Sequence, residues 1–169
     1  MILYRITQFM RGIAAKAPLP AELAEIQKYI SGEALKAFSN MTVPDQRHCI
    51  NVMHDALRLY EETDSTADRA LLVRCALLHD IGRGPDMGVF KKSLAVLGKS
   101  IWPEWSRKRA QQDKTSIFYR YYYHPMIGAA MLETMGMGEE AVIILKHHEP
   151  DFDGMPPELV LLKQADGQN

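Results

Sequence analysis

Apolar residues recur along most of the chain at intervals of three and four positions, which is the spacing of one face of an α-helix. No stretch alternates between apolar and polar residues as a half-buried β-strand does. We therefore expect an all-α fold built as a single compact helical bundle. The predicted helices cover residues 21–35, 45–61, 67–79, 126–135, 139–148 and 156–164.

Within this pattern, the helix over 67–79 is apolar enough to be central, and Asp45 is a candidate cap for the helix before it. The stretch 87–123 is less regular, so we expect one or two short helices there, with Trp102 and Trp105 as packing anchors. Pro125 is expected in the first turn of the next helix, because proline lacks the N–H that an interior position needs.

A chain of 169 residues is long enough for one domain with a sizeable core. We expect an N-terminal helical extension over 1–43 and a motif-bearing core over 44–166. The two cysteines show no disulfide spacing, which favours a reducing compartment and hence the cytoplasm. Basic residues interrupt the apolar positions of the first 17 residues, so no signal-peptide core is expected. No apolar run approaches the ~18 residues of a membrane span.

The net charge is −1, but the charges are unevenly distributed. Residues 83–120 contain nine Lys and Arg against three Asp and Glu, a local excess of +6. Such a segment is either a solvated surface or a region that attracts an anionic ligand. Binding of nucleic acid is not expected, because no helix-turn-helix signature accompanies the charge. A homo-oligomer is compatible with the sequence.

Histidines and aspartates gather where the predicted helices end. His79 and Asp80 follow an apolar helix, His124 precedes a proline, and His147 and His148 close another helix. A single histidine of this kind is usually a hydrogen-bonded structural residue, but the set is harder to explain in that way. Imidazoles with carboxylates bind divalent metals such as manganese, iron, nickel, cobalt, zinc or magnesium. One or two such ions are expected.

The residues Ala-Leu-Leu-His-Asp-Ile-Gly-Arg over 76–83 resemble the signature of the HD superfamily of metal-dependent phosphohydrolases. His48 and Asp166 match the first histidine and the final aspartate of that family. The order of His124-Pro125 and His147-His148-Glu149 is similar to the HD-GYP branch, whose members hydrolyse cyclic di-GMP. The resemblance covers about residues 44–166 and implies a helical bundle of the HD-domain type.

The resemblance also implies roles for individual residues. One metal would be held by His48, His79, Asp80 and Asp166. Asp80 would bridge to a second metal, held by His124, His147 and His148. Asp80 and Arg83 would be the catalytic residues, with Arg83 standing where the HD-GYP branch carries a lysine near the scissile phosphate.

One element of that branch is absent, because the loop over 150–156 contains no Gly-Tyr-Pro. The sequence therefore predicts a metal-dependent phosphohydrolase, a phosphodiesterase or phosphomonoesterase, without specifying cyclic di-GMP. Its substrate would be a nucleotide, a cyclic nucleotide or another small phosphorylated compound, attacked by a water molecule whose pKa the metal lowers. The alternative is a non-catalytic HD-type signalling module that binds a nucleotide or a protein. His54 lies about 240° around its helix from His48 and is not expected to bind metal.

Overall fold

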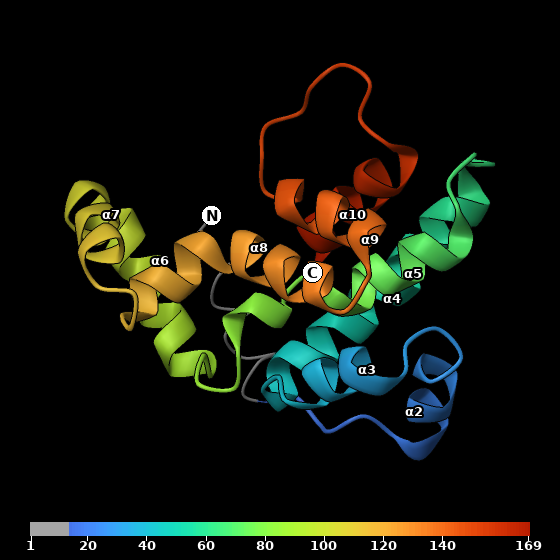
Figure 1. Ribbon diagram of the computed structural model, residues 1–169, viewed down its shortest axis with the longest axis horizontal. Coiled ribbons are helices and arrows are strands. Elements are labelled where there is room, and N and C mark those ends of the chain that lie inside the picture. The colour runs from blue at the N-terminus through green and yellow to red at the C-terminus, as the bar shows by residue number, and fades with distance from the viewer. Residues whose placement is uncertain (1–13) are drawn as a thin grey trace.

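The computed structural model describes residues 14–169, and every regular element in that range is a helix. The predicted all-α fold is therefore confirmed (Figure 1). Residues 1–13 lie outside the described part, and with them the start of the expected N-terminal extension and most of the stretch in which no signal-peptide core is expected. The elements are α2 (Pro20–Ile26), α3 (Gly32–Ser39), α4 (Val43–Glu62), α5 (Arg69–Leu78), the 3-10 helix η1 (Ile81–Arg83), α6 (Val89–Ile101), α7 (Pro103–Gln112), α8 (Ile117–Thr134), α9 (Gly138–Lys146) and α10 (Pro157–Gln168).

Helix α5 is central, as its apolar sequence predicted. It packs against α4, α9 and α10, while α8 packs on α9 and η1. Both cysteines, Cys49 and Cys75, are buried free thiols in this core. None of the helices within residues 14–169 has the length and apolar character needed to cross a membrane. The largest fully buried side chains of the core are Ile26, Phe38, Ile50, Met53, Leu72, Leu77, Leu78, Ile81, Leu132, Ile144 and Leu159.

Helices α6 and α7 and the first half of α8 form a lateral lobe, residues 89–123, on one side of the bundle (Figure 1). The lobe is more helical than predicted and has a small core of its own around Phe118. The expectation that Trp102 anchors the packing is wrong, since Trp102 is 60% exposed. Trp105 is 56% exposed but does contact the core of the lobe, because its ring packs edge-to-face on Phe118 with 5.3 Å between the ring centroids. Phe118 also packs at Gly98, where a Cβ would lie 2.5 Å from its ring.

The N-terminal helices also differ from the prediction. The single helix expected over 21–35 is broken into α2 and α3, and α3 starts at Gly32, whose φ of +53° is a left-handed conformation. Asp45 is not the cap of α4. That position belongs to Thr42, whose Oγ1 accepts a hydrogen bond from the N–H of Asp45. The Asp45 side chain is thereby left to point into the protein, where it is 1% exposed.

Pro125 lies inside α8 and not in the first turn of a helix, which corrects a further expectation. An interior proline has no N–H to donate to the carbonyl four residues earlier, which here belongs to Tyr121. Nδ1 of His124 lies 2.9 Å from that carbonyl oxygen and donates to it instead. The proline is therefore tolerated because the adjacent histidine replaces its missing hydrogen bond.

Candidate metal centre

The ends of α5 and α9 and the middle of α8 meet around η1. A close approach between η1 and α8 makes this possible, because a Cβ added to Gly82 would lie 2.6 Å from the backbone nitrogen of Gly128 and closer still to the His124 carbonyl. Only a glycine fits there. The turn that follows α5 is therefore pressed against α8, and this brings Asp80 next to His124.

A first group of side chains joins α4, α5 and α10. Nε2 of His48 lies 3.3 Å from Nε2 of His79, 3.7 Å from Oδ2 of Asp80 and 3.0 Å from Oδ1 of Asp166. Nε2 of His79 lies 3.6 Å from the same Asp80 oxygen and 3.7 Å from Asp166. Asp166 reaches the group because α10 extends to Gln168, past the end predicted for it.

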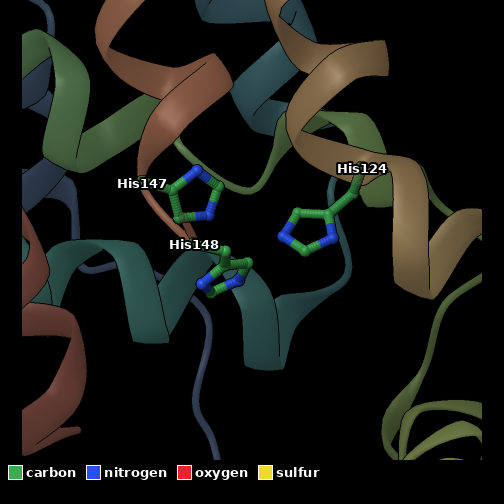
Figure 2. Close-up of side chains that lie close together, drawn as sticks. All are labelled: His124, His147 and His148. Atoms are coloured by element: carbon green, nitrogen blue, oxygen red, sulfur yellow. The ribbon is translucent and has the colours of Figure 1, made fainter. Parts of the chain in front are cut away.

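A second group consists of His124, His147 and His148, which offer nitrogen atoms within 4.8 Å of one another. Figure 2 shows their rings gathered around one point, with His124 coming from α8 and the other two from the end of α9. His124 and His147 are buried, while His148 lies at the exposed edge. The predicted histidines therefore come together in space, and their ligation of a metal stays a prediction.

Asp80 stands between the two groups and is fully buried. Its Oδ2 faces His48 and His79, and its Oδ1 lies 3.3 Å from Nε2 of His124. One oxygen of the carboxylate thus faces two imidazoles of the first group, and the other oxygen faces His124 of the second group. This is the arrangement that a bridging carboxylate requires.

The tautomers of three histidines are set by the backbone. Nδ1 of His79 lies 2.9 Å from the Ala76 carbonyl, and Nδ1 of His147 lies 2.6 Å from the Ile144 carbonyl. His124 makes the same contact three residues back along its own helix. A carbonyl oxygen only accepts, so Nδ1 must donate in each case, and Nε2 is left as a lone pair facing the cluster.

These lone pairs fit a cation. Nε2 of His124, Nε2 of His147 and Oδ1 of Asp80 are buried atoms without a hydrogen-bond partner among the described residues. Buried acceptors that face one another are costly unless a cation lies between them. Donor atoms around a tetrahedral ion with bonds of about 2.1 Å are about 3.4 Å apart. The observed separations of 3.0–3.7 Å in the first group match that spacing.

The protonation states of His124, His147 and Asp80 are also those that metal ligands require. Burial, helped by the charge of Arg83, lowers the pKa of His124 to about 4. Burial and the neighbouring His79 lower the pKa of His147 to about 3, so both rings are neutral at pH 7. Burial works to raise the pKa of Asp80, but the charge of Arg83, together with the contacts from His79, His124 and Lys92, outweighs it and holds that pKa well below the usual range. Neutral imidazoles around an ionised carboxylate are suited to a divalent ion.

Arg83 is buried, and its Nη1 donates to Oδ2 of Asp80. The same Nη1 lies 3.6 Å from Oδ1 of Asp45, which also accepts from Lys92 of α6. Asp45 and Lys92 are neighbours of the cluster that the sequence patterns do not single out. The position of Asp45 three residues before His48, on the same face of α4, was the available signal. His54 is half-exposed and faces Glu25 at 4.0 Å, away from the cluster, as expected.

Two comparisons with known proteins found nothing, since no curated protein and no solved structure matches the chain. A third found a match to the family model of the HD domain over residues 46–167. That range contains the whole cluster, from His48 to Asp166. Because the match covers well over half of the chain, the protein belongs to the HD domain family.

Proposed function

We propose that this protein is a metal-dependent phosphohydrolase that uses water to cleave a phosphoester of a nucleotide or cyclic nucleotide. The observation that carries the proposal is the position of Asp80, whose Oδ2 faces His48 and His79 while its Oδ1 faces His124. A buried carboxylate shared in this way is better explained by two adjacent cations than by hydrogen bonding. Membership of the HD domain family supports the same conclusion.

The cluster divides into two ligand sets. His48, His79, Asp80 and Asp166 would hold one ion, and Asp80, His124, His147 and His148 a second. Divalent ions bound there would polarise a phosphoryl oxygen and lower the pKa of a water molecule toward neutrality. The chain's own contribution is to keep His124 and His147 neutral and Asp80 ionised, and to direct the Nε2 atoms of His79, His124 and His147 toward the cluster.

Arg83 is the proposed second catalytic residue. Its guanidinium lies against Asp80, so a phosphate bound at the cluster would meet its positive charge. Its Nε is buried and has no hydrogen-bond partner among residues 14–169, and therefore has a donor to offer. Such a donor stabilises the negative charge that grows on a phosphoryl group during hydrolysis.

A cavity of about 260 Å³ beside His148 supports a nucleotide substrate. Its walls are mostly apolar and aromatic, with one imidazole, one carboxylate and no Lys or Arg, which suits an uncharged flat group better than a second phosphate. Aromatic side chains stack on nucleobases. A nucleotide with its phosphate at the cluster would place its base here. The lining residues are Tyr122, Tyr123, Pro125, Met126, Leu145, His148 and Glu149.

The test is a hydrolysis screen of phosphomonoesters, phosphodiesters and cyclic nucleotides with protein loaded with manganese, iron, nickel or cobalt. We expect turnover that His79→Ala abolishes and that His54→Ala, the control on the exposed face of α4, leaves unchanged. Metal-loaded protein that binds nucleotides but cleaves none of these esters would overturn the proposal and favour a non-catalytic binding module.

A further inference from the structure

A buried acid next to the cluster has no role in the ligand sets described above. Asp45 is 1% exposed, although it belongs to the first turn of α4, where an acidic side chain is usually solvated. A buried carboxylate is costly unless other groups pair with it. Its partners are the hydroxyl of Thr42, which donates at 2.7 Å to Oδ2, and two cations on Oδ1.

Those two cations come from different parts of the chain. Lys92 belongs to α6 in the lateral lobe, and its Nζ donates to Oδ1 of Asp45. Arg83 belongs to η1, and its Nη1 faces both Oδ1 of Asp45 and Oδ2 of Asp80. Two carboxylates and two cations therefore alternate in a continuous row from α6 to the candidate metal ligand.

Within that row, the Arg83 guanidinium and a metal ion compete for one atom. Oδ2 of Asp80 is the oxygen that faces His48 and His79, and it is also the oxygen to which Arg83 donates. A cation that pairs fully with this oxygen repels an incoming divalent ion. Asp45, whose Oδ1 lies 3.6 Å from the same Nη1, attracts the same cation.

We propose that Asp45 is a positioning residue that shares the Arg83 guanidinium with Asp80 and so leaves Asp80 available to a metal ion. Lys92, on α6, weakens the attraction of Asp45 for Arg83. The inference rests on the proposed metal centre. It gives the lateral lobe a defined electrostatic connection to that centre, because Lys92 joins α6 directly to α4.

The proposal predicts opposite signs for neighbouring substitutions. Asp45→Asn leaves the guanidinium to Asp80 alone, so metal affinity should fall, by about 10–100-fold as for other partners of ligands. Lys92→Met leaves Asp45 free to attract Arg83, so affinity should rise. Arg83→Gln removes the competing cation and should also tighten metal binding, while it slows hydrolysis. Lys91 is an exposed neighbour on α6, so Lys91→Met is the matched control and should change neither metal affinity nor the rate of hydrolysis.

The experiment is calorimetric titration of the metal-free protein with Mn²⁺, and with Zn²⁺ as a second probe, for each variant. Circular dichroism and thermal unfolding establish which variants are folded. A double variant, Asp45→Asn with Arg83→Gln, separates a role through Arg83 from the general effect of removing a negative charge. We expect Asp45→Asn to change affinity by less than about threefold in that background, because coupled residues are not additive.

Three outcomes would overturn the proposal: an unchanged affinity in Asp45→Asn, the same loss with and without Arg83, or a loss in Lys92→Met as large as in Asp45→Asn. If Asp45→Asn does not fold, the direction of the change in metal affinity in Lys92→Met and in Arg83→Gln still tests the proposal, and a fall in both variants would overturn it. Wild-type protein that binds neither ion would instead refute the metal centre itself, and the positioning role with it.

Discussion

Nε2 of His124 lies 3.3 Å from Oδ1 of Asp80, and neither atom takes part in a hydrogen bond with the described residues. The His124 ring is neutral at pH 7 and donates from its other nitrogen, so two lone pairs face each other across this gap. Two acceptors held in contact inside a protein repel each other. A divalent ion bound between them converts that repulsion into two favourable bonds.

Removal of the Asp80 carboxylate should therefore abolish both metal retention and hydrolysis. We expect Asp80→Ala to lower metal affinity by more than about 100-fold, since a direct ligand matters more than its supporting partners. Metal content after dialysis, measured by mass spectrometry, and the rate of phosphoester hydrolysis test this. An Asp80→Ala protein that keeps its full metal content and rate would contradict the bridging role.

Metal removal should lower thermal stability. The cluster holds several buried lone pairs together, so an ion that binds only the folded state stabilises it by about 2.7 kcal/mol at one hundred times its dissociation constant. For a chain of this length, that corresponds to a rise in Tm of roughly 5–10 °C. Calorimetry before and after chelation, and after metal is returned, provides the measurement. Equal Tm values in all three states would refute a metal held by the folded cluster.

Gly82→Ala should destabilise the protein and disturb the cluster together. The added Cβ would meet the backbone of α8 at His124 and Gly128, and backbone atoms cannot move aside as a side chain can. We expect a loss of at least about 2 kcal/mol in the free energy of unfolding. Gly138→Ala is the control, because a Cβ there meets nothing within 4 Å. Urea unfolding of both variants tests the prediction, and similar losses in the two would contradict it.

The pair of Glu22 and Arg47 predicts a pH-dependent contribution to stability. Both Glu22 oxygens accept from Arg47, at 2.5 and 2.9 Å, and this hydrogen bonding lowers the pKa of Glu22 from 4.5 to about 2. A carboxyl with a lowered pKa in the folded state stabilises the fold above its unfolded value and loses that effect as the pH falls. The contribution is thus complete above about pH 5 and declines between pH 4.5 and 2.

Glu22→Gln should therefore cost about 1 kcal/mol at pH 7, the upper range for a partly exposed ion pair. The difference from the wild type should shrink as the pH is lowered from 4.5 toward 3, measured by urea unfolding at each pH. Glu33→Gln, in an exposed pair with Lys36, is the control and should have little effect. A cost that stays constant down to pH 3 would show that the charge of Glu22 is not responsible.

Much of the cluster could be predicted because its residues follow strongly apolar helices. His79 and Asp80 come directly after α5, so their place at the end of a central helix is implied by the sequence. Asp45 could not be identified in this way, because an aspartate at the start of a helix looks like a cap. Its true partners, Lys92 and Arg83, are distant in sequence and approach it only through the packing of α6 and η1.

The errors in the predicted fold also arise from contacts between residues that are distant in sequence or from local hydrogen bonds that a helix pattern does not reveal. Large aromatic residues in an amphipathic stretch are expected to be buried, yet Trp102 is mainly exposed, and Trp105 contacts Phe118 with only part of its surface, while Phe118 packs at Gly98. Which aromatic side chain is buried depends on where a glycine leaves room, and the residue pattern of one helix does not contain that information. Pro125 was likewise placed by a rule for isolated helices that the hydrogen bond of His124 overrides.

The hydrogen bonds from Nδ1 of His79, His124 and His147 to carbonyls three residues earlier tie each imidazole to a turn of its own helix. Fraying of the last turn of α5 or α9 would therefore misdirect a nitrogen as soon as the backbone opened. Bound metal should, in turn, slow amide hydrogen exchange in those turns. Exchange rates at the ends of α5 and α9 would thus report occupancy of the cluster without any knowledge of the substrate.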